Sequence, residues 1–154
     1  MNRTSTKLKK RVAGQNDFES ITALLKSVNL TIQGVKENLN NFIVLKYEDN
    51  LVGVGGFEIY GNKALLRSVA VEKGLQGTGL GKILVEEIIS IARSKDIYEM
   101  YLLTETAPEF FKSLGFYEVS RDMVDEGIKS SEEFSSICPL TAVCLKMKTK
   151  PNRK

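Results

Sequence analysis

The sequence contains no histidine among its 154 residues. This absence excludes Ser-His-Asp and Cys-His nucleophiles, and it excludes metal sites that are built on imidazole. Any proton transfer must therefore use a carboxylate, a tyrosine, a thiol, a lysine or water.

Cysteine is scarce as well, since Cys138 and Cys144 are the only two in the chain. No histidine and no third cysteine can complete a zinc site, so we expect no metal. Isolated cysteines of this kind are more often small buried hydrophobic residues than ligands. The pattern is typical of a protein from a reducing compartment.

Long hydrophobic runs are also missing. The first ten residues lack the apolar core of a signal peptide, and no stretch approaches the roughly 20 apolar residues that cross a bilayer. We therefore expect a cytoplasmic protein without a membrane partner. Repeats, low-complexity tracts and Pro/Gly/Ser-rich linkers are absent too, which predicts a single domain over residues 1–154 with its core at about 7–148.

The charge is concentrated at the two ends of the chain. The whole sequence has 22 basic and 19 acidic residues, and the segments 1–11 and 146–154 each hold five basic residues and no acid. The part between them therefore has 12 basic and 19 acidic residues, a net charge of −7. A nucleic-acid-binding protein needs a basic face on its folded body, so we expect no nucleic-acid partner.

Hydrophobic patterning predicts an α+β fold. Turn pairs separate three successive strands, which predicts an antiparallel meander, and Asp17 is expected to cap the first helix. We expect a mixed, mostly antiparallel sheet of about six to seven strands with helices on both faces. The predicted strands cover residues 7–13, 41–47, 51–60, 63–71, 98–104, 116–120 and 141–147. The predicted helices begin close to residues 17, 34, 82 and 107. Residues 122–137 are expected to form short helices or a loop.

A glycine-rich stretch, Gly74 to Gly81, lies between a predicted strand and the strongest predicted helix. Unhindered backbone N–H groups and the positive end of a helix converge at such a point, which favours binding of an anion such as phosphate. The spacing does not fit a Walker loop, because only three residues separate Gly77 from Gly81-Lys82 and Ile83 replaces the magnesium-binding hydroxyl. It also does not fit the dinucleotide fingerprint G-x-G-x-x-G.

The segment Gln76-Gly77-Thr78-Gly79-Leu80-Gly81 matches the signature Q/R-x-x-G-x-G/A. In this segment and in its element order the chain resembles the GNAT acyl-CoA N-acyltransferases, over nearly its whole length. The family's downstream pattern Asn-x-x-Ala-x-x-x-Tyr-x-x-x-Gly-Phe aligns with Thr104, Ala107, Phe111, Gly115 and Phe116. Within the family, the segments 65–71, 101–104 and 134–139 resemble the arsenic-resistance N-acetyltransferase branch.

The resemblance implies the GNAT fold and acetyl-CoA as cosubstrate. The backbone amides from Gln76 to Lys82 would hold the pyrophosphate. The backbone from Val69 to Val71, in the preceding strand, would bind the pantetheine arm like an added strand. Phe111 stands at the tyrosine position beside the cofactor. The residues assigned to the cofactor in this way are Val69, Ala70, Val71, Gln76, Gly77, Thr78, Gly79, Leu80, Gly81, Lys82 and Phe111.

The resemblance also implies direct attack of an amine on the thioester, near Val69 and Thr104. The Val69 N–H would polarise the developing oxyanion. The family often uses a tyrosine as the acid for the thiolate, but Phe111 has no proton to give. Thr104, Tyr60, Tyr101 or water could replace it, and the thiol is a fair leaving group without much help.

The sequence does not decide which residue is the general base or which amine is the acceptor. Glu58 and Glu105 are the nearest carboxylates that could accept the proton of the amine. Arg67 could pair with the carboxylate of an acceptor, or it could pair only with Glu58. The implied partner is a small-molecule amine, either an amino acid or an amino-acid-like toxicant.

Three alternatives complete the expectations. A catalytically silent sensor that binds acyl-CoA would also fit, because Phe111 replaces the tyrosine and the preceding strand carries no glutamate. The resemblance to the arsenic-resistance branch implies that Cys138 and Cys144 could bind trivalent arsenic, although a third soft ligand is missing. A homodimer is left open.

Overall fold

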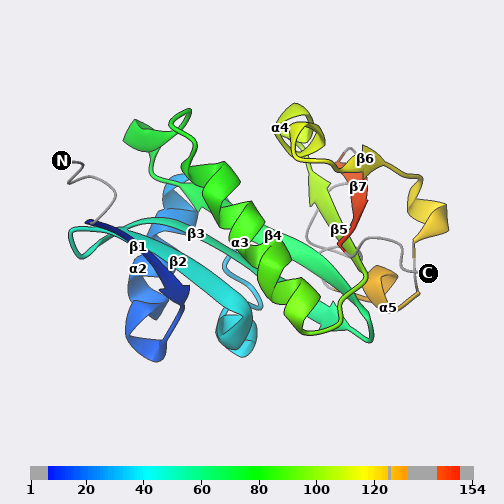
Figure 1. The fold of residues 1–154 in the computed structure, drawn as a ribbon, viewed down its shortest axis with the longest axis horizontal. Helices are drawn as coiled ribbons and strands as arrows, with labels where there is room; N and C mark the ends of the chain where they lie inside the picture. The colour runs from blue at the N-terminus through cyan, green and yellow to red at the C-terminus, as the bar shows by residue number, and fades with distance from the viewer. Residues whose placement is uncertain (1–6, 125, 132–141, 150–154) are drawn as a thin grey trace. The chain divides into compact units, whose positions relative to one another are not determined.

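The computed structural model describes residues 7–124, 126–131 and 142–149. Its seven strands are hydrogen-bonded in the order β1-β2-β3-β4-β5-β7-β6, as Figure 1 shows. Parallel pairing joins β4 to β5, and antiparallel pairing joins β1 to β2, β2 to β3, β5 to β7 and β6 to β7. The strands are β1 (Leu8–Val12), β2 (Phe42–Tyr47), β3 (Asn50–Tyr60), β4 (Lys63–Val71), β5 (Glu99–Thr104), β6 (Tyr117–Glu118) and β7 (Val143–Lys148).

In the described parts of the chain, four α-helices and four short 3-10 helices connect these strands. The 3-10 helices cover Gln15–Asp17, Lys36–Asn41, Lys73–Leu75 and Arg121–Met123. The α-helices are α2 (Phe18–Ser27), α3 (Leu80–Ser94), α4 (Pro108–Ser113) and α5 (Glu126–Lys129). None of the described helices is long and apolar enough to cross a bilayer. The predicted α+β class with a mixed, mostly antiparallel sheet is confirmed.

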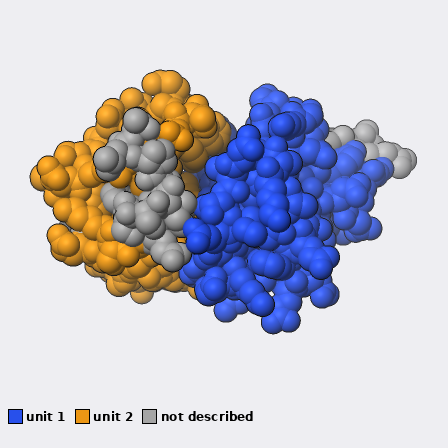
Figure 2. Space-filling model, turned by 180° about the vertical axis from the view of Figure 1, so that it is seen from behind, with its two compact units in different colours: residues 1–57, 68–88 blue, residues 58–67, 89–154 orange. Residues whose placement is uncertain are grey.

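The chain forms two compact units (Figure 2). Unit 1 consists of Met1–Phe57 and Ser68–Ile88, and unit 2 consists of Glu58–Arg67 and Ile89–Lys154. The boundary therefore crosses the backbone of β3, β4 and α3. The single domain expected over residues 1–154 stays a prediction.

In unit 1, helices cover both faces of the strands (Figure 1). The apolar face of α2 packs into a core with residues of β2, β3 and β4, including Phe42, Val44 and Val54. Neighbouring residues in a strand point to opposite faces. Accordingly, a Cβ built on Gly53 would lie 3.0 Å from Leu84, and one on Gly55 would lie 2.8 Å from Ile88, so α3 approaches the other face closely.

Gly56 is required by its cross-strand neighbour. It pairs directly with Phe42 of β2, and a Cβ on Gly56 would lie 2.5 Å from that ring. The ring covers the glycine and thereby fills the place of the missing side chain. This contact fixes the register of β2 against β3.

The prediction that Asp17 caps α2 is wrong. Its side chain makes no bond to the N–H groups of that helix. It accepts instead from the Gly14 N–H at 2.8 Å and pairs with Arg11 at 2.8 Å and Lys46 at 3.3 Å. The Arg11 guanidinium lowers the pKa of Asp17 to about 2, against the opposing effect of burial. The carboxylate therefore ties β1 and β2 to the start of α2.

Two further elements differ from the predictions. The helical piece after residue 34 is a 3-10 helix over Lys36–Asn41 that is broken at Asn38. The strand expected over 116–120 is reduced to β6, because Phe116 turns inward against Phe111. The Ser120 hydroxyl accepts from the Asp122 N–H at the start of the next turn.

In unit 2, β7 lies between β5 and β6 and is fixed at its C-terminal end. The Thr149 N–H donates to the Tyr98 carbonyl at 2.9 Å, and the Thr149 hydroxyl bonds to the Ile97 carbonyl. Arg93 of α3 donates to the Thr149 carbonyl. Thr149 is completely buried, so this segment is part of the core of unit 2.

Candidate functional site

The glycine-rich loop of unit 1 is held at both ends by backbone hydrogen bonds. At the end of β4, the Glu72 N–H donates to Val52 at 2.9 Å, and the Leu75 N–H donates to Glu72 at 2.8 Å. At the other end, the Ile83 N–H donates to the Gly79 carbonyl at 3.2 Å as α3 begins. The predicted order of strand, glycine turn and helix is confirmed.

Two glycines are needed by the backbone of this loop. Gly77 has φ +83° and Gly79 has φ +95°, values that L side chains rarely adopt. A Cβ at Gly74, Gly77 or Gly79 would meet nothing within 4 Å. The loop backbone is therefore open to the approach of a ligand.

The N–H groups of this loop form a run without acceptors. Leu75 and Ile83 donate to carbonyls, but the seven amides from Gln76 to Lys82 have no acceptor in the described parts of the chain. The last three of these belong to the first turn of α3, where N–H groups have no partner inside the helix. Their partial positive charges add to that of the helix end, which creates a binding site for an anion.

One side chain ties the loop to β4, and a second one closes a turn within the loop. The Gln76 side-chain amide donates to the Val71 carbonyl at 3.1 Å, and the Thr78 hydroxyl donates to the Leu75 carbonyl at 2.5 Å. The Val71 carbonyl is therefore already occupied. Lys82 is exposed.

Strand β4 has an irregular backbone at one residue. Ser68 has φ +61° although it is not a glycine, and it is buried within a strand that is otherwise largely buried. Such a conformation is strained and interrupts the regular pleat directly before Val69, the predicted oxyanion donor. The sequence gives no signal for it, because serine has no preference for this region.

A buried hydrogen-bonded chain in unit 2 contains Arg67 and Glu58. The Arg67 Nη1 donates to the Glu58 Oε2 at 2.7 Å, with the two side chains 1% and 13% exposed. The Tyr60 hydroxyl donates to the Glu58 Oε1 at 2.5 Å. Burial raises the pKa of Tyr60 well above its usual value, and Glu58 adds to this rise, whereas a hydrogen bond with Ser131 opposes it. Of the two partners expected for Arg67, the structure therefore shows Glu58.

The other predicted catalytic residues of unit 2, Thr104 and Glu105, lie at the end of β5 and just after it, and Tyr101, which is not one of them, lies within β5. The Tyr101 hydroxyl donates to Glu99 at 3.0 Å, and burial raises the pKa of this phenol. The Thr104 Oγ1 accepts from the Ala107 N–H at 3.1 Å, and its own proton has no acceptor among the described residues. Glu105 is exposed.

Phe111 is a packed aromatic residue of unit 2. It is 8% exposed and makes edge-to-face contacts with Phe110 and Phe116 at centroid distances of 5.0 Å and 5.9 Å. Its role beside the cofactor stays a prediction.

Cys144 is buried, which raises the pKa of its thiol to about 11, so it packs as an inert hydrophobic group. Cys138 lies outside the described residues. Within the described ranges, no cluster of three or more His, Cys, Asp and Glu residues could hold a metal ion.

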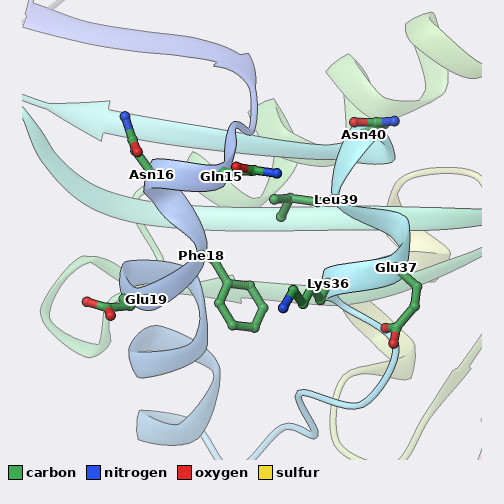
Figure 3. A pocket seen from close by; sticks show the side chains of 8 residues that line it. All are labelled: Gln15, Asn16, Phe18, Glu19, Lys36, Glu37, Leu39 and Asn40. Atoms are coloured by element: carbon green, nitrogen blue, oxygen red, sulfur yellow. The ribbon is translucent and has the colours of Figure 1, made fainter.

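A pocket of about 680 Å³ in unit 1 was not anticipated from the sequence. It lies between the start of α2 and the 3-10 helix over Lys36–Asn41, and Figure 3 shows side chains from both segments facing it. Its lining residues are Gln15, Asn16, Phe18, Glu19, Lys36, Glu37, Leu39 and Asn40. None of the predicted site residues is among them.

Comparisons with known proteins agree with this geometry. Residues 15–120 match the model of the family described as "Acetyltransferase (GNAT) family". An uncharacterized N-acetyltransferase of Chlorobaculum tepidum is 26% identical over 99 residues, which cover 64% of this chain and 63% of that protein. The amino-acid acetyltransferase of Mycobacterium tuberculosis is 29% identical over 107 residues, which cover 66% of this chain and 58% of that protein.

Among solved structures, N-acetylglutamate synthase from Neisseria gonorrhoeae, complexed with coenzyme A and N-acetyl-glutamate, has a TM-score of 0.83 at 21% identity. The match covers 94% of this chain but only 35% of the synthase. The chain thus spans less than two thirds of each of these three proteins. The structural likeness supports the fold.

Proposed function

Since the chain belongs to the acetyltransferase (GNAT) family, we propose that it transfers the acetyl group of acetyl-CoA to the amine of a small molecule. The run of seven amides from Gln76 to Lys82, which have no acceptor among the described residues, carries this proposal. A pyrophosphate provides the several oxygen acceptors that such a run needs. The crystallised synthase named above, which shares the fold, holds coenzyme A.

The pantetheine arm would bind along the backbone of Val69, Ala70 and Val71 as an added strand. Because Gln76 already bonds to the Val71 carbonyl, that oxygen is a poor acceptor for the arm. The Val69 carbonyl and the Val71 N–H are better candidates for this contact.

In the reaction, the free amine attacks the thioester carbonyl, a C–N bond forms and the C–S bond breaks. The Val69 N–H would stabilise the oxyanion that develops on the carbonyl oxygen. The sulfur leaves as thiolate and takes up a proton. Thr104 is the best candidate to donate a hydrogen bond to the thiolate and to relay this proton from water, because its hydroxyl proton has no acceptor among the described residues, whereas Tyr60 and Tyr101 donate theirs to carboxylates. We assign no proton transfer to the two tyrosines.

The proton of the acceptor ammonium needs a base. Glu58 accepts hydrogen bonds from Tyr60 at Oε1 and from Arg67 at Oε2, so both of its oxygens are already engaged. The exposed Glu105 or water fits this role better.

We propose an amino acid or a related compound as the acceptor. One relative is named an amino-acid acetyltransferase, and the structurally similar synthase was solved with N-acetyl-glutamate. Arg67 would bind the acceptor carboxylate while keeping its bond to Glu58, so that the guanidinium is shared between the two carboxylates. The segments 65–71, 101–104 and 134–139 resemble the arsenic-resistance branch, so arsenical amino acids belong in the acceptor panel.

Isothermal titration with acetyl-CoA and CoA tests the root of the proposal. Absence of binding at sub-millimolar concentration would refute it. Release of free thiol is then measured with amino acids, polyamines and arsenical amino-acid analogues as acceptors. An acyl-CoA sensor, the alternative function, would bind the cofactor and release no thiol with any amine.

A further inference from the structure

Ser68 stands apart from the other left-handed residues of the described chain. Asn29, Glu48, Asp49 and Asp96 also have positive φ, but they lie in exposed turns. Ser68 lies inside β4 and is only 9% exposed. A conformation of this kind costs about 1 to 3 kcal/mol and persists only where the surroundings hold it in place.

The residue directly before Ser68 has an unusually constrained side chain. Arg67 is tied to Glu58 at 2.7 Å with 1% of its side chain exposed. Glu58 is tied in turn by the Tyr60 hydroxyl at 2.5 Å, and Tyr60 bonds to the buried Ser131. Three hydrogen bonds therefore connect the segment after α5 with the end of β3 and the middle of β4.

We propose that Glu58 and Tyr60 are positioning residues for the oxyanion donor, because they lock Arg67 and thereby keep the backbone at Ser68 in its left-handed conformation. The inference rests on the proposed function, in which the Val69 N–H binds the oxyanion. The peptide between Ser68 and Val69 carries that N–H, and its orientation follows the dihedral angles of Ser68. A regular φ at Ser68 would relieve the strain and turn the N–H away.

This role differs in its kinetic signature from the two other roles open to the same residues. A misplaced oxyanion donor slows every attack on the thioester, including hydrolysis by water, at every pH. Loss of a general base slows amine acetylation only where the amine is protonated, so that high pH restores the rate. Loss of an anchor for the acceptor raises KM for acceptors that carry a carboxylate.

The experiment compares Tyr60→Phe and Glu58→Gln with a matched control, Tyr101→Phe. Tyr101 also donates to a glutamate two residues away in a strand of unit 2, Glu99, but it is not connected to Ser68. The measurements are kcat for acetyl transfer from pH 6.5 to 9.5, acetyl-CoA hydrolysis without acceptor, and Kd for CoA.

For Tyr60→Phe we expect kcat and the hydrolysis rate to fall together by about tenfold at all pH values. This loss is smaller than the loss caused by removing an oxyanion donor completely, because the N–H is misplaced and not absent. The Kd for CoA should stay within about twofold, because the amides from Gln76 to Lys82 are unchanged. In Glu58→Gln, kcat and the hydrolysis rate should fall further than in Tyr60→Phe. In Tyr101→Phe, kcat, the hydrolysis rate and the Kd for CoA should all stay within about twofold of wild type.

Unchanged rates in Tyr60→Phe would overturn the inference. So would a loss restricted to amine acetylation that disappears at high pH, or a loss confined to KM for carboxylate-bearing acceptors. If Glu58→Gln weakens the pairing of Arg67 so far that the protein does not fold, the result for Tyr60→Phe decides the question alone. The melting temperature of Tyr60→Phe shows that this variant is folded. A wild type that neither transfers nor hydrolyses acetyl groups would instead refute the proposed function.

Discussion

The conformation of Gly79 allows a sharp test of the loop. In Gly79→Val, the new side chain would meet no atom within 4 Å of its Cβ, so the fold has no steric reason to change. The cost comes from φ +95°, which is about 1 to 2 kcal/mol for an ordinary L residue and higher for a β-branched one. When the loop relaxes to avoid this strain, its amides no longer converge on one anion.

That strain converts to a loss of about 5- to 30-fold in affinity for CoA from the backbone alone, and the bulky side chain adds to it by blocking close approach. Gly74→Val is the matched control, because Gly74 lies in the same loop, is equally open and has no positive φ. Isothermal titration with CoA gives the affinities. Thermal unfolding of the free proteins should shift by no more than a few degrees in either variant.

Wild-type affinity in Gly79→Val, or an equal loss in Gly74→Val, would refute the reasoning. The first result would place the anion elsewhere. The second would show that bulk in the loop, and not the left-handed backbone, controls binding.

Three other predictions concern stability and rate. Gly56→Ala forces a methyl group against the Phe42 ring, at 2.5 Å before relaxation, and should lower the free energy of unfolding in urea by about 1 to 3 kcal/mol; no loss would show that the ring moves freely. Asp17→Asn removes a carboxylate whose pKa is about 2 in the folded state against a usual 3.8. Its stabilisation, about 2 kcal/mol at most, is present above pH 3.8 and is lost as the pH falls through about 2, so wild type and variant should converge in urea unfolding near pH 2. Thr104→Val should lower kcat for acetyl transfer by about tenfold or more with KM for acetyl-CoA unchanged, whereas an unchanged kcat would assign the proton to water.

Much of the fold follows from local patterns in the sequence. The meander of β2, β3 and β4 follows from alternating apolar residues and two-residue turns, and α3 follows from its apolar stripe. The role of Asp17 was predicted wrongly because a residue before a helix usually caps it, whereas here Arg11 and Lys46 from neighbouring strands compete for the carboxylate. Partners that are distant in sequence leave no local signal.

In the candidate site too, features set by local sequence were predictable, and features set by distant partners were not. The glycine-rich loop was predictable because glycine spacing constrains backbone conformation directly. The left-handed Ser68 was not, because nothing in its own residue type favours φ +61°. The pairing of Glu58 with Arg67 was one of two alternatives in the sequence, and only the structure shows Tyr60 as the second donor to the same carboxylate.

The position of β7 has a consequence for synthesis of the chain. This strand is made after β5 and β6 but lies between them, so neither neighbour can pair with it until residue 148 has left the ribosome. Until then β5, whose Met100, Tyr101 and Leu102 are buried in the finished protein, presents an unpaired apolar edge. The nascent chain is therefore most exposed to wrong strand pairing in the short interval before its last strand is complete.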